Sequence, residues 1–234
     1  MNSAFRIRAP FFEIGPKAYL YGQASLDLAL EADRLCEEYD VDIIYTPQCV
    51  DIRMIAEATN RLLVFAQHMD PLRIGKGIGS VLPEAIKAAG ARGVLLNHSE
   101  KKMTLGDLRT AIARADEVGL ATLVCADNLA EARAIAQFEP DIILAEPPEL
   151  IGTRNGSVES RSYVREINEA IRNINPGISV LHGAGIYSAK DVEAIIGLGA
   201  EGTGCTSGIV KAEDPTRSMR EMIRSLRETW DRTR

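Results

Sequence analysis

Patterned cysteines are missing from this 234-residue chain. Its four cysteines are scattered, with no Cys-x-x-Cys pair and no histidine at metal-ligand spacing: Cys36, Cys49, Cys125 and Cys205. Disulfide frameworks and zinc sites both show regular cysteine or histidine spacings, which this sequence does not have. We therefore expect no metal site and no disulfide, and we expect a protein of the reducing cytoplasm.

Clusters of positive charge are missing as well. The formal net charge is −6 at pH 7, and no run of Lys or Arg interrupts it. Nucleic-acid surfaces are basic, so this balance argues against a nucleic-acid partner. A small anionic ligand would need local compensation from a lysine or from backbone N–H groups.

Long apolar runs are a third absence. The opening MNSAFRIRAPFFEIG, residues 1–15, has neither the apolar segment nor the small-residue cleavage pattern of a signal peptide. No later run approaches the roughly 20 apolar residues that a membrane-spanning helix needs. We therefore expect no signal peptide and no membrane partner.

Short apolar runs are present in a regular series. Hydrophobic residues make up 46% of the chain and charged residues 26%, enough apolar material for one large core. Runs rich in Val, Ile and Leu without polar alternation are typical of strands covered on both faces. Eight runs are predicted strands, the last of them weak because it is rich in glycine: 11–14, 41–45, 61–66, 93–96, 121–125, 141–145, 178–182 and 201–205.

Amphipathic stretches separate these runs. TLGD at 104–107 and SAKD at 188–191 have the pattern of a capping box, which opens a helix. Pro83 suits the first turn of a helix, and Gly90 and Gly119 suit positions just after helix ends. One predicted helix carries an apolar stripe between Leu26 and Leu35, and another begins at residue 188. The other predicted helices are 52–59, 82–89, 104–118, 129–137, 160–173 and 215–231.

Strands that alternate with helices form βαβ units and a parallel sheet. Eight such units in 234 residues, without a linker, predict an α/β chain folded as one (β/α)₈ barrel domain over residues 1–234. A doubly wound sheet is the alternative. It commonly has fewer strands and a glycine-rich loop after the first strand, which GPKAYLYG at 15–22 does not resemble.

Reactive side chains follow several predicted strands. The chemistry of such barrels lies at the carboxyl ends of their strands. Lys17 follows the first strand, His98 and Glu100 the fourth, and Glu146 the sixth. Small residues follow the seventh and eighth strands, where barrel phosphate sites form and where glycine lets backbone N–H groups approach an anion: Gly183, Ala184, Gly185, Ser207 and Gly208.

This set of residues suggests a proton transfer next to a carbonyl group. Glu146 would be the base, and His98 and Lys17 would polarise the carbonyl and stabilise an enediolate. The segment PPELIGTRNGS at 147–157 would form a lid that excludes water, with Gly152 donating its N–H to a phosphate. The plainer interpretation is that Glu146 is the first solvated residue after a strand, and Glu149 is a second candidate for the base.

Several ordered motifs resemble the triosephosphate isomerase family in its short archaeal form. They are FAQHMDP (65–71), GVLLNHSEKKMTLGDL (93–108), VCADN (124–128), AEPPELIGT (145–153) and GAGI followed by LGAEG and SG (183–208). The resemblance covers nearly the whole chain. It implies a TIM barrel and a homodimer or homotetramer that needs no cofactor.

The resemblance also assigns roles to single residues. Lys17 and His98 match the family's electrophiles, Glu146 its catalytic base and Glu100 a supporting glutamate. Gly152 matches the phosphate-binding glycine of the lid. The other phosphate-binding positions match Gly183, Ala184, Gly185, Ser207 and Gly208.

Four departures from the family pattern stand out. The first strand is normally followed by Asn, an aromatic residue and Lys, whereas this chain has Gly15, Pro16 and Lys17. Arg154 replaces a lid glycine, GKGIG at 75–79 replaces a Ser-His-Thr-Gly loop, and His182 replaces a small residue. The retained proton-transfer residues and the altered neighbours suggest the same reaction on a different sugar phosphate.

The expected function is therefore an aldose–ketose isomerase of a small sugar phosphate, with dihydroxyacetone phosphate and glyceraldehyde 3-phosphate as the leading pair. A tetrulose phosphate is the second possible substrate, because Gly15 leaves room for another carbon and hydroxyl. Two functions of a different kind stay open: a non-catalytic sugar-phosphate-binding protein, and another phosphate-binding barrel enzyme such as a lyase or epimerase.

Overall fold

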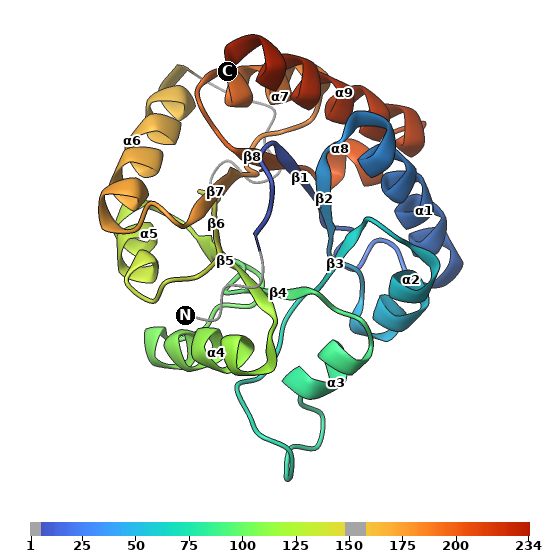
Figure 1. The fold of residues 1–234 in the computed structure, drawn as a ribbon, viewed down its shortest axis with the longest axis vertical. Coiled ribbons are helices and arrows are strands. Elements are labelled where there is room, and N and C mark those ends of the chain that lie inside the picture. Colours follow the sequence, from blue (N-terminus) through green and yellow to red (C-terminus); the bar gives the residue numbers. More distant parts are fainter. Residues whose placement is uncertain (1–5, 148–157) are drawn as a thin grey trace.

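A computed structural model describes residues 6–147 and 158–234. Eight parallel strands form a closed barrel in chain order, with β8 paired to β1 (Figure 1). The strands are β1 Phe11–Ile14, β2 Asp42–Tyr45, β3 Leu63–Ala66, β4 Gly93–Leu96, β5 Ala121–Ala126, β6 Ile142–Ala145, β7 Ser179–His182 and β8 Gly202–Gly204. The predicted (β/α)₈ barrel is confirmed, and the doubly wound sheet is wrong.

Helices form a ring around the barrel (Figure 1). Their bounds are α1 Gly22–Tyr39, α2 Ile52–Ala58, α3 Pro83–Ala88, α4 Leu105–Val118, α5 Leu129–Ala136, α6 Val158–Ile174, α7 Ala189–Gly197, α8 Ser207–Val210 and α9 Pro215–Thr233, with a 3₁₀ turn, η1, at Cys49–Asp51. Within the described ranges, none of these helices is both long and apolar enough to cross a bilayer.

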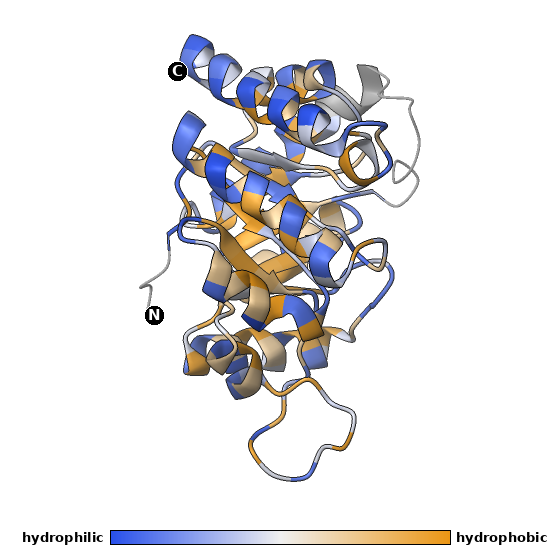
Figure 2. Ribbon diagram, turned by 90° about the vertical axis from the view of Figure 1, so that its right-hand side faces the viewer, coloured by the Kyte–Doolittle hydropathy of each residue, from blue (hydrophilic) through white to orange (hydrophobic). Residues whose placement is uncertain are grey.

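The apolar residues pack in two layers. One fills the barrel interior, where Phe11, Ile44 and Phe65 meet side chains from β4 to β7. The other lies between the barrel and its helices, and Figure 2 shows the corresponding hydrophobic colouring of the sheet and the inward helix faces. Strand side chains alternate between these layers because successive residues point to opposite faces.

Glycine in the strands makes room for large rings. A Cβ on Gly202 would lie 2.5 Å from the Phe11 ring, and a Cβ on Gly93 would lie 2.4 Å from the Phe65 ring. These contacts explain why β8 forms although its sequence has little strand propensity. Closure of the barrel and packing around Phe11 outweigh the weak local preference.

The predicted helix signals are largely confirmed. The Thr104 hydroxyl accepts a hydrogen bond from the Asp107 N–H, and α4 is followed by its C-cap Gly119, which has a φ of 71°. Ser188 differs, because its side chain makes no cap to the helix backbone and instead donates to Asp191. The short helix α8 was not predicted, since four residues carry too little periodicity to be recognised.

A long loop joins β3 to α3 and projects from the barrel (Figure 1). It spans residues 67–82, and it exposes Ile74 and Ile78. Both isoleucine side chains therefore face solvent on one loop.

Candidate active site

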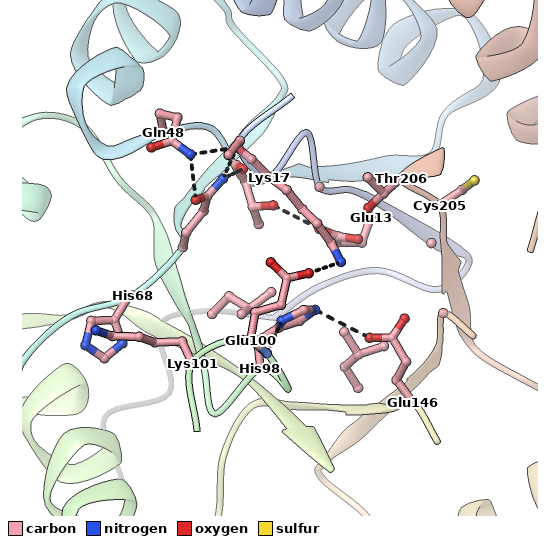
Figure 3. A pocket seen from close by; sticks show the side chains of 18 residues that line it. Glu13, Lys17, Gln48, His68, His98, Glu100, Lys101, Glu146, Cys205 and Thr206 are labelled. Atoms are coloured by element: carbon pink, nitrogen blue, oxygen red, sulfur yellow. Dashed lines mark hydrogen bonds and ion pairs between the residues drawn. The ribbon is translucent and has the colours of Figure 1, made fainter. Parts of the chain in front are cut away.

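A cavity of about 280 Å³ lies where the carboxyl ends of the strands meet (Figure 3). Five residues singled out from the sequence line it: Lys17, His98, Glu100, Glu146 and Gly183. They follow β1, β4, β6 and β7, so residues far apart in the chain converge on one space. Gly15, one of the departures from the family pattern, also lines the cavity. Other lining residues were not predicted, among them Glu13, Thr46, Gln48, Gln67, Cys205 and Thr206.

Lys17 is held in a backbone conformation that non-glycine residues rarely adopt. Its φ is 49°, in the left-handed region, and its carbonyl oxygen accepts hydrogen bonds from Gln48 at 2.7 Å and Gln67 at 3.0 Å. Such local strain persists where surrounding contacts determine it. The two glutamine amides therefore fix the direction in which the lysine enters the cavity.

The Lys17 ammonium group is paired with Glu100. Its Nζ donates a hydrogen bond of 2.7 Å to Glu100 Oε1. Burial alone lowers the pKa of Lys17, but the hydrogen bond and the charge of Glu100 outweigh it, so the pKa is raised. Lys17 is consequently a permanent positive charge inside the cavity. Glu100 is itself mostly exposed, which fits a supporting role.

His98 presents one ring nitrogen to the cavity and uses the other to bind its own loop. The Glu100 backbone N–H donates to His98 Nδ1 at 3.1 Å, so Nδ1 is an acceptor and the neutral ring carries its proton on Nε2. Burial lowers the pKa of His98, and the charge of Lys17 lowers it further. The imidazole is therefore neutral at pH 7 and can donate from Nε2.

Asn97 shapes the loop that carries His98. Its φ is 60°, and its side-chain amide donates to the Cys125 carbonyl and to Glu131, each at 2.9 Å. Its side-chain oxygen accepts from Met103 N–H at 3.1 Å. These bonds tie the β4–α4 loop to β5 and α5.

Glu146 is a buried carboxylate rather than a solvated residue at the end of a strand. Its side chain is 16% exposed, and Oε2 lies 3.7 Å from His98 Nε2 (Figure 3). Its backbone N–H is bound to the Ala126 carbonyl, which continues the β5–β6 pairing. Burial raises the pKa of Glu146, and the charge of Lys17 opposes that rise. A raised pKa makes this carboxylate a stronger base.

The small turns after β7 and β8 lie close together. A Cβ on Gly208 would lie 2.8 Å from the Cys205 sulfur and 2.9 Å from the Tyr187 backbone, so only glycine allows this approach. Gly185 has a φ of 75°. Of the predicted phosphate-binding residues, Gly183 lines the cavity, whereas Ala184, Gly185, Ser207 and Gly208 stand outside its lining. Glu149, Gly152 and Arg154 fall outside the described residues.

His182 does not line the cavity. Its Nε2 lies 3.0 Å from the Asn168 side-chain oxygen on α6, and burial lowers its pKa to about 4. The departure at this position therefore serves packing between β7 and α6. Across residues 6–147 and 158–234, no group of three His, Cys, Asp or Glu side chains is arranged to hold a metal ion.

Glu13 is the most unexpected member of the site. It sits in the run FFEI on the same side of β1 as Phe11, so it points into the barrel. It is 7% exposed, and the Thr46 hydroxyl donates to Oε1 at 3.0 Å. Burial raises the pKa of Glu13 to about 8, the bond from Thr46 opposes the rise, and the charge of Glu146 adds to it. A lone carboxylate in an apolar strand was the sequence signal for this residue.

This raised pKa makes stability depend on pH. The folded state binds a proton at Glu13 up to about pH 8, whereas the unfolded chain releases it near 4.5. Since the folded state holds more protons in that range, the free energy of unfolding contributed by Glu13 falls as pH rises from about 4.5 to 8. In the wild-type protein we expect this fall in the free energy of unfolding to be on the order of a few kcal/mol. In Glu13→Gln, which cannot ionise, we expect it to be absent. Urea unfolding of the wild type and of Glu13→Gln near the two ends of that pH range measures the difference. The same pH dependence of the free energy of unfolding in the two proteins would contradict the prediction.

Comparison with known proteins identifies relatives along nearly the whole chain. The family model for triosephosphate isomerase matches residues 17–226. The triosephosphate isomerase of Methanocaldococcus jannaschii is 42% identical over 206 residues, which are 88% of this chain and 94% of that protein. That of Methanobacterium bryantii is 40% identical over 220 residues, 93% of this chain and 97% of that protein.

A more distant relative extends the match. The triosephosphate isomerase of Sulfurisphaera tokodaii is 35% identical over 230 residues, which are 97% of this chain and 99% of that protein. The barrel, the cavity at the strand ends and these matches agree, and this chain belongs to the triosephosphate isomerase family, a family of isomerases.

Proposed function

We propose that this enzyme interconverts an aldose and a ketose of a small phosphorylated sugar, with dihydroxyacetone phosphate and glyceraldehyde 3-phosphate as its substrate pair. The observation that carries the proposal is the meeting of a buried carboxylate, a neutral imidazole and a lysine ammonium in one cavity. Glu146 removes a proton from the carbon next to the carbonyl and returns it to the neighbouring carbon through an enediolate.

His98 and Lys17 stabilise the charge that develops on the substrate oxygens. The His98 Nε2–H faces the same space as Glu146, 3.7 Å from its Oε2. A neutral donor matches the modest basicity of an enediolate oxygen, and Lys17 adds a fixed positive charge. Glu100 positions both, because its carboxylate binds Lys17 Nζ and its N–H fixes the His98 ring.

The phosphate group is assigned to the turns after β7 and β8 together with Gly152. Gly183, Ala184, Gly185, Ser207 and Gly208 supply backbone N–H groups there, and the close approach at Gly208 brings the two turns together. The reaction needs no metal or organic cofactor, because substrate and product are isomers: Glu146 carries the carbon-bound proton, and the hydroxyl proton moves from one substrate oxygen to the other. The whole chain, residues 1–234, acts as one catalytic domain in the cytoplasm.

A tetrulose phosphate is the second candidate substrate. Gly15 carries no side chain at the cavity wall, where the family has asparagine, and polar groups of Glu13, Thr46 and Thr206 surround that position. The Glu13 carboxyl takes up the space that a side chain at residue 15 would need, so the extra hydroxyl of a longer sugar would meet these polar groups from the cavity side.

Turnover of purified protein tests both substrates. Isomerisation of dihydroxyacetone phosphate and of erythrulose phosphates is measured side by side, with Glu146→Gln as the control. High triose turnover that depends on Glu146 supports the leading pair, and strong tetrulose turnover with weak triose turnover supports the second. Binding without any turnover would support a non-catalytic sugar-phosphate-binding protein.

Assembly into a homodimer or homotetramer is part of the proposal. The side chain of Ile78 is fully exposed on the β3–α3 loop, and Ile74 on the same loop is also exposed. Burying them against a second copy would remove that unfavourable exposure. We expect Ile78→Lys to lower the mass measured by light scattering after gel filtration, while Lys190→Met on α7 leaves it unchanged. An unchanged mass for Ile78→Lys would exclude this loop.

A further inference from the structure

The carboxyl of Glu13 stands where the structure leaves room beside Gly15. A Cβ on residue 15 would lie 2.9 Å from Glu13 Oε1, 3.2 Å from Thr46 Oγ1 and 3.4 Å from Thr206 Oγ1. A side chain at residue 15 and the present Glu13 carboxyl would therefore compete for one space. Glycine at 15 and glutamate at 13 depend on each other.

A second glycine makes room for the other carboxyl oxygen. A Cβ on Gly204 of β8 would lie 3.0 Å from Glu13 Oε2 and 2.9 Å from the Glu13 carbonyl. Residues at the ends of three strands thus surround this one side chain: Gly15 follows β1, Thr46 follows β2, and Gly204 is the last residue of β8. Because the residues around Glu13 fit its side chain this closely, we regard the carboxyl as an integral part of the cavity wall.

The two carboxyl oxygens differ in their partners. Oε1 accepts the bond from Thr46, whereas Oε2 has no hydrogen-bond partner among residues 6–147 and 158–234. Glu13 lines the cavity, so Oε2 is the oxygen available to a ligand. Figure 3 shows Glu13 in the same part of the cavity as Lys17 and Thr206.

We propose that Glu13 is a substrate-binding residue whose protonated carboxyl occupies the space left by the missing side chain at Gly15 and donates a hydrogen bond from Oε2 to an oxygen of the bound sugar. The inference rests on the proposed function, because it needs a sugar phosphate in this cavity. It assigns to β1 a donor that no motif of the chain indicates.

The surroundings keep this carboxyl neutral. The burial of the group and the charge of Glu146 favour the protonated form, whereas the Thr46 hydroxyl and Lys17 favour the ionised form. The thiols of Cys125 and Cys205 also interact with Glu13, and burial raises both of their pKa values, so they stay uncharged. The resulting pKa of about 8 leaves a proton for donation at neutral pH. A neutral carboxylic acid in an apolar site is an effective donor to a developing oxyanion.

Two variants separate the donor from the shape of the side chain. Glu13→Leu removes the donor, and Glu13→Gln keeps an N–H donor of nearly the same size that cannot ionise. We expect Glu13→Leu to lower kcat/KM by roughly 10²-fold, the loss typical of one such donor, and Glu13→Gln to lose less. The wild-type kcat/KM falls above about pH 8 as Glu13 ionises, and this fall disappears in Glu13→Gln.

A binding measurement tests Glu13 without turnover. In a Glu146→Gln background, calorimetry measures the Kd of dihydroxyacetone phosphate and of an erythrulose phosphate, with and without Glu13→Leu. We expect the added change to weaken binding of at least one ligand about tenfold. If the proposed function is wrong, the wild-type protein will show no turnover. If this inference is wrong, adding Glu13→Leu to the Glu146→Gln background will leave both Kd values unchanged.

The pH profile decides the case if Glu13→Leu does not fold. Glu13→Gln has the same shape as the wild-type residue, so it reports on ionisation alone. Equal losses in Glu13→Leu and Glu13→Gln would overturn the donor role, and so would an alkaline fall that persists in Glu13→Gln. A smaller loss and a flat alkaline profile in Glu13→Gln would support it.

Discussion

Glu146→Gln is expected to lower kcat by roughly 10²–10⁴-fold, the contribution of a well-placed general base. The amide has almost the same size as the carboxyl, so the cavity keeps its shape, but it cannot accept the substrate proton. Since the carboxylate is 16% exposed and burial raises its pKa, its replacement removes a buried charge and does not destabilise the fold. Steady-state turnover of the preferred sugar phosphate measures the loss.

The matched control is Glu139→Gln, an exposed glutamate on the loop before β6. It makes the same chemical change outside the cavity, and its kcat is expected to stay within about twofold of wild type. In the wild-type protein, kcat/KM should fall on acidification through a pKa above the ordinary glutamate value, because the base must be ionised. Turnover that survives Glu146→Gln would assign the base to another residue, of which Glu149 is the first candidate.

Lys17→Met is expected to lower kcat/KM by roughly 10²–10³-fold, because it removes the fixed positive charge beside the reacting oxygens. Methionine keeps the length of the aliphatic chain, so the loss reports on charge more than on packing. Lys17 also holds down the pKa of Glu146, and its removal should move the acid limb of the kcat/KM profile to higher pH. A purely structural role for Lys17 would lower activity without that shift.

The matched control is Lys190→Met on the exposed surface of α7. Its kcat/KM and pH profile should match the wild type, since it touches nothing in the cavity. Thermal unfolding of both variants shows whether either change affects the fold. If Lys17→Met loses less than about tenfold in kcat/KM, the charge of Lys17 is not needed for the reaction and His98 stabilises the oxyanion alone.

Much of the fold could be predicted because buried strands leave continuous apolar runs in the sequence and because these runs recur regularly along the chain. The eight apolar runs lie within two residues of the observed strands, because strands covered on both faces need continuous apolar sequence. Thr104, Gly119 and Pro83 mark helix ends through local backbone chemistry, which does not depend on distant contacts. The glycine-rich β8 was the weakest prediction, since its strand depends on closure against β1 and on the Phe11 ring.

The sequence alone determined which residues follow which strands, and the parallel arrangement then brings Lys17, His98, Glu100 and Glu146 to one end of the barrel. Only the tertiary structure decided their chemical state. The tautomer of His98 follows from the Glu100 N–H, the strained backbone of Lys17 depends on Gln48 and Gln67, and the raised pKa of Glu146 follows from burial. Glu13 shows the difference most clearly. In the chain it is one charged residue in an apolar strand. Its environment comes from Gly15, Thr46 and Gly204 at the ends of three strands, because desolvation and hydrogen bonding depend on neighbours that only folding provides.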